Sequence, residues 1–234
     1  MLSINSVTVS YGKLRAIQDV SIQVADRDLV AVIGSNGAGK TTLLRAISGL
    51  NEIASGTIEF DGKRLDGLAP RHICEMGIVH VPEGRRIFPL MNVMENLQLG
   101  AYLSRARKMI PESLEQVYSL FPVLRERRKQ SARTLSGGEQ QMLAIGRGLM
   151  GRPSLMILDE PTMSLSPKLS ADILETLRTL NAEGIAVLLV SQEVLHSLEL
   201  ARMAYVIENG RITLQGAANE LSASEHVRKA YLGL

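Results

Sequence analysis

The chain has 234 residues, of which 45% are hydrophobic and 21% charged, and its formal net charge is +2. A chain of this length and composition can bury a core of its own without a disulfide, which argues against disorder. The longest apolar run is 185–190, six residues, whereas a membrane-spanning helix needs about 20. No charged and apolar leader opens the sequence, and the single Cys74 excludes an internal disulfide. We therefore expect a protein that neither spans a bilayer nor is secreted, which fits a reducing cytosol.

Positive charge is concentrated in the middle of the chain, where residues 71–133 hold 11 Lys and Arg against 6 Asp and Glu. Such a segment can face nucleic acid, an anionic membrane surface or a partner protein. Because bases usually stack on aromatic rings, an aromatic content of 3% without Trp argues against single-strand nucleic-acid binding. The basic run 125–129 is either a solvated helix end, which we favour, or a contact with membrane subunits or acidic lipid.

The first part of the chain predicts strands and one helix. These are strands within 1–24, a buried strand at 29–33, a helix at 40–48 stopped by Gly49, and a hairpin of 57–60 and 63–65. Residues 92–150 are predicted to be mostly helical, with breaks at Pro111, Pro122 and Ser136-Gly137-Gly138.

The second part alternates apolar strands with amphipathic helices. The predicted strands are 155–158, 185–190, 203–207 and 211–214, and the predicted helices are 167–181 and 193–200. This alternation is typical of an α/β fold with a mainly parallel sheet covered by helices. The mostly helical stretch 92–150 is then expected to be an insertion into this α/β core. We expect one domain, with a core and an antiparallel β subdomain in 1–88 and 152–234, and a helical subdomain in about 89–151.

The strongest local motif fits the phosphate-binding loop, in which Gly, four residues and Gly-Lys-Thr follow a buried strand and open a helix. It consists of Gly34, Ser35, Asn36, Gly37, Ala38, Gly39, Lys40, Thr41 and Thr42. Glycines let backbone N–H groups turn inward around phosphate oxygens, and the helix N-terminus adds favourable partial charge. Lys40 is expected to reach the β- and γ-phosphates, and Thr41 to bind Mg²⁺. A glycine-rich turn without a ligand is the weaker interpretation, because motif and context agree.

A second motif is an apolar strand, 155–158, that ends in the carboxylates Asp159 and Glu160. Hydrolysis of a nucleotide needs a metal to neutralise phosphate charge and a base to orient the attacking water. Asp159 is suited to bind Mg²⁺, and Glu160 is suited to orient the attacking water. A lone Asp-Glu pair is by default two solvated acids, but the phosphate loop makes the functional interpretation stronger.

A third motif, Leu135-Ser136-Gly137-Gly138-Glu139-Gln140-Gln141, precedes a predicted helix. Ser136 can cap this helix, Glu139 follows three residues later as in a capping box, and the two glycines permit close backbone approach. From these residues alone, an ordinary capped helix is the favoured interpretation.

In this order and at this spacing, the three motifs resemble the ATP-binding subunit of ATP-binding-cassette (ABC) proteins, over essentially the whole chain. Residues 81–88 (VPEGRRIF), 138–147 (GEQQMLAIGR) and the ending Ala230-Tyr231-Leu232-Gly233 are similar to one branch of that superfamily. It is the smaller of two ATPases in high-affinity branched-chain amino-acid importers. Amide and urea importers use closely related subunits.

The resemblance implies a P-loop ATPase of the ABC type, with ATP and Mg²⁺ as cofactors. Tyr11 matches an aromatic residue that stacks on adenine, although a tyrosine that simply packs at a strand end stays open. Ser136, Gly137, Gly138 and Glu139 would bind the nucleotide held by a second ATPase subunit, with Ser136 and Gly138 at its γ-phosphate. Two subunits would sandwich two nucleotides, and closure on ATP would drive the membrane subunits.

The sequence departs from the wider superfamily at a few positions. Glu83 stands where a glutamine usually binds Mg²⁺ and water, and Gln192 where a histidine usually contacts the γ-phosphate; both are habits of the branch. Ser191 is less expected, and Ser166 lacks a carboxylate used between subunits. Because charge-assisted hydrogen bonds are about twice as strong as neutral ones, Gln192 puts the turnover rate in doubt rather than ATP binding. The resemblance assigns catalysis to Glu160 and Gln192, and Mg²⁺ to Thr41, Glu83 and Asp159.

We therefore expect an ATPase subunit on the cytoplasmic face of the inner membrane that powers uptake of branched-chain amino acids or a related small solute. Its partners would be membrane-spanning permease subunits, a second identical or homologous ATPase and, indirectly, an extracytoplasmic solute-binding protein, but no nucleic acid. Two alternatives stay open: an amide or urea importer, and an ATP-gated interaction protein with little hydrolysis.

Overall fold

The computed structural model describes residues 1–232, and Gly233 and Leu234 lie outside the described residues. The strands are β1 (Leu2–Tyr11), β2 (Leu14–Val24), β3 (Leu29–Ile33), β4 (Ser55–Phe60), β5 (Lys63–Arg64), β6 (Ile78–Val81), β7 (Leu155–Asp159), β8 (Ala186–Ser191), β9 (Met203–Glu208) and β10 (Arg211–Ala217). The helices before the third motif are α1 (Lys40–Ile47), α2 (Pro70–Glu75), α3 (Val93–Gly100), α4 (Ser104–Arg107), α5 (Ile110–Leu120), α6 (Pro122–Glu126) and the 3-10 turn η1 (Ala132–Thr134). After it come α7 (Gly137–Leu149), α8 (Pro167–Ala182), α9 (Val194–Leu200), α10 (Ala218–Ala223), α11 (Glu225–Val227) and the π-helical turn η2 (Arg228–Leu232).

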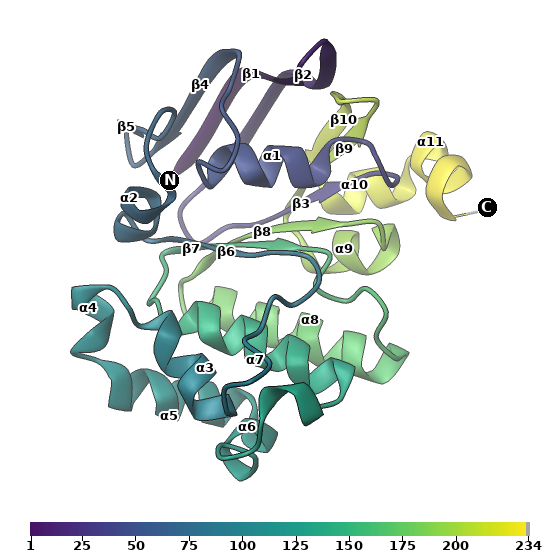
Figure 1. Ribbon diagram of the computed structural model, residues 1–234. Helices are drawn as coiled ribbons and strands as arrows, with labels where there is room; N and C mark the ends of the chain where they lie inside the picture. Colours follow the sequence, from purple (N-terminus) through teal and green to yellow (C-terminus); the bar gives the residue numbers. More distant parts are fainter. Residues whose placement is uncertain (233–234) are drawn as a thin grey trace.

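In residues 1–232 the strands form two sheets, one with the order β2-β1-β4-β5 and one with the order β10-β9-β3-β8-β7-β6. The first is antiparallel, whereas β9, β3, β8, β7 and β6 run parallel and β10 closes the second sheet as an antiparallel edge. Figure 1 shows α1 between the two sheets and α3, α5, α7 and α8 on the other side of the parallel sheet. The predicted fold class, α/β with a mainly parallel sheet and an antiparallel β part, is confirmed.

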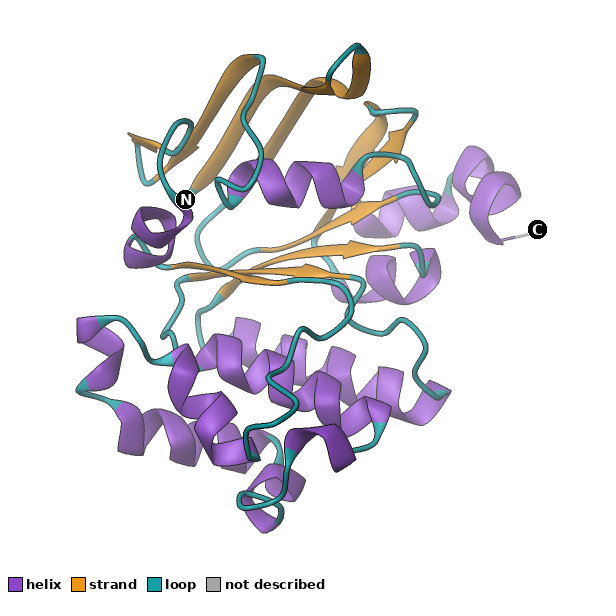
Figure 2. Cartoon of the chain, in the orientation of Figure 1, coloured by secondary structure: helices purple, strands orange, loops and turns teal. Residues whose placement is uncertain are grey.

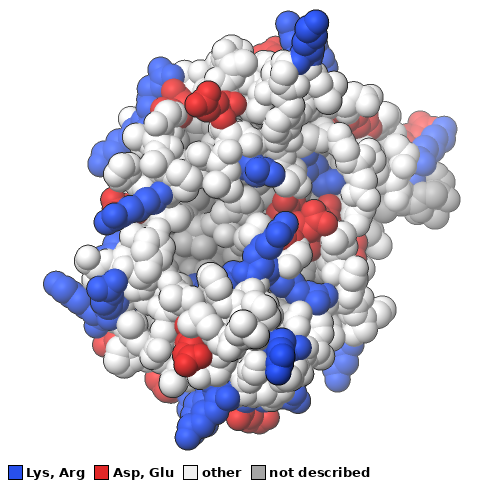
Figure 3. Space-filling view, in the orientation of Figure 1, with Lys and Arg blue, Asp and Glu red and all other residues white. Residues whose placement is uncertain are grey.

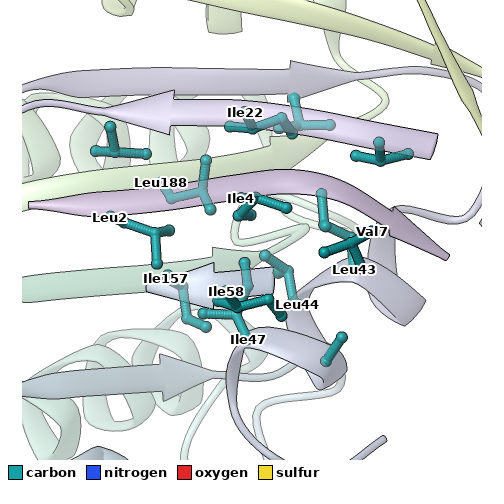
Figure 4. Packing of buried hydrophobic residues seen from close by; sticks show 14 of the residues in the cluster. Leu2, Ile4, Val7, Ile22, Leu43, Leu44, Ile47, Ile58, Ile157 and Leu188 are labelled. Carbon is teal, nitrogen blue, oxygen red and sulfur yellow. The ribbon is translucent and has the colours of Figure 1, made fainter. Parts of the chain in front are cut away.

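The parallel strands are buried on both faces because their side chains point alternately into apolar clusters on the two sides of the sheet. Leu155 and Ile157 of β7 pack with α1 and the antiparallel sheet, whereas Met156 and Leu158 pack with the helices on the opposite side. Residues of the first core point toward one another from both sheets and from α1 in Figure 4; the labelled ones are Leu2, Ile4, Val7, Ile22, Leu43, Leu44, Ile47, Ile58, Ile157 and Leu188. This packing fixes α1, and with it the loop before it, against the sheet.

The helical stretch between β6 and β7 was predicted together with its breaks, and these predictions are confirmed. Pro111 and Pro122 lie in the first turns of α5 and α6, where a missing N–H costs nothing, and Ser136 caps α7. Figure 2 shows this stretch, together with α8, as the helical half of the molecule below the parallel sheet. Helix α2 and the short helices α10 and α11 were not predicted, since three to six residues carry too little periodic signal.

The parallel strands leave one edge of the sheet for function. Strands β3, β8 and β7 are neighbours and end at Ile33, Ser191 and Asp159, so the segments that follow all begin at the same edge. Ligands of open α/β sheets bind outside the carboxyl ends of the strands. The phosphate-loop motif, the paired acids and Gln192 therefore come together.

Candidate nucleotide-binding site

The glycine-rich loop joins β3 to α1, and its backbone conformation requires glycine. Gly37 and Gly39 have φ of +80° and +106°, and Gly39 is the N-cap of α1. A Cβ on Gly39 would lie 2.6 Å from Cγ2 of Ile17 and 2.8 Å from the carbonyl oxygen of Ala16. The start of β2 thus presses against the loop, so the loop can only follow its path with glycine at this position.

Lys40 is the first residue of α1 and is 5% exposed. Its ammonium donates hydrogen bonds to the carbonyl oxygens of Gly34, at 2.8 Å, and Ser35, at 3.0 Å. It also lies 3.3 Å from Oε1 of Glu160. The loop thus curls around its own lysine, and a buried cation stands where β3 and β7 end.

Asp159 is the last residue of β7 and Glu160 follows it directly; both are buried. Glu160 has a φ of +48°; its N–H donates to the carbonyl oxygen of Val190, at 2.9 Å, and its Oε2 accepts the N–H of Gln192, at 3.0 Å. A non-glycine residue in the left-handed region is uncommon and marks strain held by its surroundings. The carboxylate of Glu160 is therefore fixed by the backbone at the end of β8.

The surroundings of the Asp159 carboxylate are suited to a cation. Neither of its carboxylate oxygens has a hydrogen-bond partner of ordinary geometry among residues 1–232. Burial raises the pKa of Asp159 to about 6, and the negative charges of Glu83 and Glu160 act in the same direction, while the Thr41 hydroxyl and Lys40 lower it. A buried carboxyl without a donor is a group that a divalent cation would satisfy.

Thr41, Glu83 and Asp159 line a common cavity of about 410 Å³, so the three residues predicted to bind Mg²⁺ lie together. No cluster of three His, Cys, Asp or Glu that would hold a metal by itself occurs in residues 1–232. Mg²⁺ usually takes one or two carboxylates together with substrate phosphates and water. A hydroxyl and two carboxylates beside a phosphate loop fit that donor set.

The phosphate loop opens onto a larger cavity of about 620 Å³. Its walls comprise Leu14, Arg15, Ala16, Asn36, Gly37, Gly39, Lys40, Thr41, Thr42, Glu83, Glu160, Met163, Asn209 and Gly210. The lining at 14–16 and 209–210 was not predicted. The N–H of Gly210 donates to the carbonyl oxygen of Ala38, at 3.0 Å, and the N–H of Gln18 donates to the carbonyl oxygen of Gly210, at 2.7 Å. These bonds hold the start of β2 and the turn between β9 and β10 against the loop.

Tyr11 lies outside the lining of this cavity, at the end of β1, where it is 48% exposed. Its hydroxyl accepts a hydrogen bond of 2.6 Å from the side chain of Asn51. Leu14 and Arg15, on the strand that follows, do line the cavity. The ring of Tyr11 is thus accessible beside the cavity.

The third motif is built as a capped helix. The Ser136 N–H donates to Oε2 of Glu139, at 2.8 Å, and the Glu139 N–H donates to the Ser136 hydroxyl, at 3.4 Å. A Cβ on Gly138 would lie 2.5 Å from Cδ1 of Leu169, so α7 and α8 meet closely at this glycine. Residues 136–139 do not line the cavity of the phosphate loop in the described part of the chain. Within one chain, therefore, this motif and the loop are separate surfaces.

The residues that depart from the wider superfamily have structural roles of their own. Ser166 caps α8, accepting from the N–H of Leu169, at 3.5 Å. Ser191 accepts the N–H of Glu193, at 2.9 Å, whose carboxylate accepts the hydroxyl of Thr162, at 3.0 Å. Gln192 is exposed, and its contact with Glu160 is made by its backbone N–H rather than its side chain.

The basic run 125–129 is partly paired within the chain. Arg125 forms an ion pair with Glu115 and lies 5.2 Å from the ring centre of Tyr118, and Arg127 lies 3.1 Å from Glu139. On the face drawn in Figure 3, basic side chains are spread over both halves with acidic ones between them. This distribution agrees with the favoured interpretation of a solvated helix end.

A strand, a glycine loop and a helix that bring a buried lysine against strand-end carboxylates define a P-loop nucleotide-binding ATPase. Comparison with known proteins gives the family. The ABC transporter family matches residues 17–163, and the chain belongs to it. It is a nucleotide-binding subunit of the ABC type, whose members hydrolyse ATP to power transport. The predicted family, fold class and activity are confirmed.

Relatives of known family match the chain over its full length, among them two transport ATP-binding proteins. It is 45% identical over 233 residues to the high-affinity branched-chain amino acid transport ATP-binding protein BraG of Pseudomonas aeruginosa, with 100% of both chains covered. It is 34% identical over 235 residues to the probable branched-chain amino acid transport ATP-binding protein LivF of Archaeoglobus fulgidus, with 100% and 99% covered.

Solved structures agree with the fold. An ATP-binding cassette of an ABC transporter in its ADP conformation matches with a TM-score of 0.85 and 27% identity, covering 100% of this chain and 99% of the other. A nucleotide-free cassette matches with a TM-score of 0.82 and 28% identity, covering 100% and 95%. In residues 1–232, every helix falls short of the length and apolarity that a membrane crossing requires.

Proposed function

We propose that the chain binds Mg-ATP and hydrolyses it to power uptake of branched-chain amino acids, as a peripheral subunit on the cytoplasmic face of the inner membrane. The position of Glu160 is the observation that best supports ATP hydrolysis. Its carboxylate is buried, held by the backbone of Gln192 and placed 3.3 Å from Lys40 on the wall of the phosphate-loop cavity. Full-length identity to BraG and LivF supports the choice of solute.

In this proposal the cavity of the phosphate loop holds the nucleotide. Backbone groups of Gly34, Ser35, Asn36, Gly37, Ala38, Gly39, Lys40, Thr41 and Thr42 surround the phosphates. The Lys40 ammonium exchanges loop carbonyls for phosphate oxygens, and Tyr11 offers its exposed ring to the base. Charge-assisted contacts of this kind are about twice as strong as neutral ones.

Thr41, Glu83 and Asp159 would hold Mg²⁺, which supplies charge neutralisation for the phosphates. Glu160 accepts a hydrogen bond from the attacking water and orients it toward the γ-phosphate. Because Glu160 is fixed at both its backbone and its carboxylate, it needs no reorganisation when the water arrives. Gln192 fixes Glu160 through its N–H, and its exposed side chain is free to donate to the γ-phosphate.

Residues 136–139 would complete the site of a second ATPase subunit, identical or homologous, because they lie apart from the loop of their own chain. In this proposal the chain is one domain with two parts. Residues 1–88 and 152–234 form the core with a β subdomain, and residues of about 89–151 form a helical subdomain. The helical subdomain carries the motif offered to the partner. Closure of the two subunits on ATP would then be transmitted to the membrane.

A second surface, the groove between α2, β6, α3 and α7, is suited to bind a permease subunit. An apolar cavity of about 540 Å³ lies between α2, β6, α3 and α7, and half-exposed Leu50, Phe88, Leu99 and Tyr102 border it. Two buried polar atoms here, Nε2 of His80 and Nη1 of Arg147, have no hydrogen-bond partner in residues 1–232. An apolar groove bordered by half-exposed apolar side chains fits a cytoplasmic helix of a membrane-spanning subunit.

The Glu160→Gln variant tests the assignment of hydrolysis. Glutamine keeps the shape and the contact with the Gln192 N–H but removes the basic carboxylate, so turnover should fall about 100-fold or more while ATP binding is kept. ATP affinity by calorimetry and phosphate release, both on the full chain, separate the two effects. Equal turnover in variant and wild type would show that Glu160 is not the group that orients water.

A different experiment tests the solute and the low-turnover alternative, which the uncharged Gln192 and Ser166 favour. Purification from native membranes in mild detergent should bring permease subunits and an ATPase partner. In the reconstituted complex, leucine with its binding protein should stimulate ATP hydrolysis. Stimulation by amides or urea instead would support the related importers, and ATP binding with negligible turnover in the complex would support a gated interaction protein.

A further inference from the structure

A strained turn directly follows Glu83. Gly84, Arg85 and Arg86 have φ of +77°, +65° and +45°, and the Arg86 N–H donates to the carbonyl oxygen of Gly84, at 2.6 Å. Three successive residues in the left-handed region are unusual, and two of them carry long side chains. Such strain persists when the surrounding structure holds it and is concentrated at functional sites.

The turn directs Arg85 onto the start of α7. Nη1 of Arg85 donates to Oε1 of Gln140, at 3.2 Å, and the Gln140 amide donates to the carbonyl oxygen of Leu135, also at 3.2 Å. The guanidinium also lies against the backbone of Gly137, where a Cβ would be 2.9 Å from Nη2 and 3.1 Å from Nη1. Arg85 therefore holds the chain on both sides of Ser136.

Stability of the helix does not account for this contact. The start of α7 already has its capping box of Ser136 and Glu139, which satisfies the N–H groups of these two residues. A cation at a helix N-terminus opposes the helix dipole and is unfavourable there. Arg85 is held at this position by a strained turn, so its role is other than stabilising α7.

The same contact borders the catalytic carboxylate. Arg85, Gln140, Glu160 and Ser164 line one cavity of about 380 Å³. Arg85 also lies two residues after Glu83, which lines the cavity of the phosphate loop. Arg85 thus stands between the nucleotide site of its own chain and residues 135–138.

We infer that Arg85 is a positioning residue for the segment Leu135–Gly138, which the chain offers to the ATP of a second subunit. This inference rests on the proposed function. Arg85 holds the segment through Gln140 and Gly137, so that its loss slows hydrolysis without weakening the binding of ATP to the phosphate loop. Arg85 lies two residues after Glu83, which lines the nucleotide cavity of its own chain. A change at that nucleotide would therefore also shift the segment Leu135–Gly138, which contacts the nucleotide of the second subunit.

The test is a double-mutant cycle on the full chain with Arg85→Ala, Gln140→Ala and both together. Each single variant should lower kcat for Mg-ATP about tenfold, the size expected for one lost hydrogen bond to a charged group, and the double variant should be no slower than either. ATP affinity of the subunit and the unfolding temperature should stay at the wild-type values. Arg85→Lys should recover part of the rate, since it keeps one donor but not the flat contact with Gly137.

A matched control separates position from charge. Arg133 lines the same cavity, but its side chain forms no hydrogen bond or ion pair with residues 1–232. Arg133→Ala removes the same charge and should leave kcat unchanged. Amide hydrogen exchange supplies the direct readout: residues 135–138 should exchange faster in Arg85→Ala and at the wild-type rate in Arg133→Ala.

Each other outcome overturns the inference. Faster exchange with unchanged kcat would make the contact purely structural, and lower kcat with unchanged exchange would mean that Arg85 acts on the reaction directly. Unchanged kcat in an active wild type would refute the role of Arg85 alone. A wild-type chain that does not hydrolyse ATP, by itself or with its membrane partners, would refute the proposed function and this inference with it.

Discussion

The ammonium of Lys40 and the carboxylate of Glu160 lie 3.3 Å apart, although one residue opens α1 and the other follows β7. They meet because β3, β8 and β7 are neighbouring strands that run parallel, so that β3 and β7 end at the same edge of the sheet. Both side chains are only 6% exposed, and little water screens them. The residue expected to bind phosphate and the residue expected to orient water are therefore coupled.

Lys40→Met should weaken ATP binding about tenfold or more, because the phosphates lose a buried cation. It should also lower the free energy of unfolding by about 1–3 kcal/mol, since Glu160 is left buried without its partner. Calorimetry and urea unfolding measure the two effects. Lys40→Met combined with Glu160→Gln should recover much of the stability, and strictly additive losses would contradict the coupling.

Gly39→Ala should damage the phosphate loop more than Gly37→Ala, although both positions have positive φ. A Cβ on Gly39 would collide with Ile17 and Ala16, whereas one on Gly37 would meet no atom of residues 1–232 within 4 Å. We expect the Gly37 variant to lose about 1 kcal/mol of stability and the Gly39 variant more, together with ATP affinity. Thermal unfolding and nucleotide titration of the pair check this, and equal losses would refute the collision.

His80 should make the fold sensitive to acid. The hydroxyl of Ser48 donates to the carbonyl oxygen of Leu44, at 2.7 Å, so Nδ1 of His80 must be the donor to Ser48, at 2.9 Å, and Nε2 carries the lone pair. Burial lowers the pKa of His80 to about 4, and the charge of Arg45 adds to this effect. The unfolded chain, with a pKa near 6.5, therefore takes up a proton first as the pH falls.

The stability due to neutral His80 is complete above about pH 6.5 and is lost as the pH falls toward 4. At pH 5 this loss should be about 2 kcal/mol relative to pH 7.5. Urea unfolding of wild type and His80→Gln at both values isolates the effect, because other groups titrate alike in the two proteins. A difference between them that does not change with pH would contradict the lowered pKa.

Arg202 should matter for stability more than its exposure suggests. Its Nε and Nη2 donate to the two carboxylate oxygens of Asp28, at 2.6 and 2.5 Å, and Asp28 is 6% exposed. Arg202→Gln leaves that carboxylate without its cation, so we expect a loss of about 1–3 kcal/mol. Arg178→Gln is the control, because its pair with Glu175 is exposed on both sides and should contribute less than about 0.5 kcal/mol. Equal losses by chemical denaturation would contradict the argument.

Local motifs were predictable because neighbours in the chain form them. The loop from Gly34 to Thr42, the strand before it and the helix after it depend on glycine conformations and apolar runs within a few residues. The capping box of Ser136 and Glu139 depends on a spacing of three. The alternation of strands and helices likewise predicted the parallel sheet.

Contacts between distant segments were not predictable in this way. Residues 14–16 and 209–210 line the nucleotide cavity because the start of β2 and the turn between β9 and β10 pack on the phosphate loop. Asn209-Gly210 is recognisable as a turn, but no local pattern shows that it meets this loop. The contact that holds Glu160 is made by the backbone N–H of Gln192. Any residue other than proline has that donor, so the sequence does not mark this contact.

The sequence by itself determined the class of this protein, since a phosphate loop, a pair of strand-end acids and a capped glycine motif are each specified by residues close together in the chain. The tertiary structure decided which of those residues meet. Lys40 faces Glu160, Arg85 reaches Gln140, and the 136–139 motif stays away from its own phosphate loop. These relationships follow from the strand order and from the packing of apolar clusters on both faces of one sheet, which depend on contacts between residues far apart in the chain.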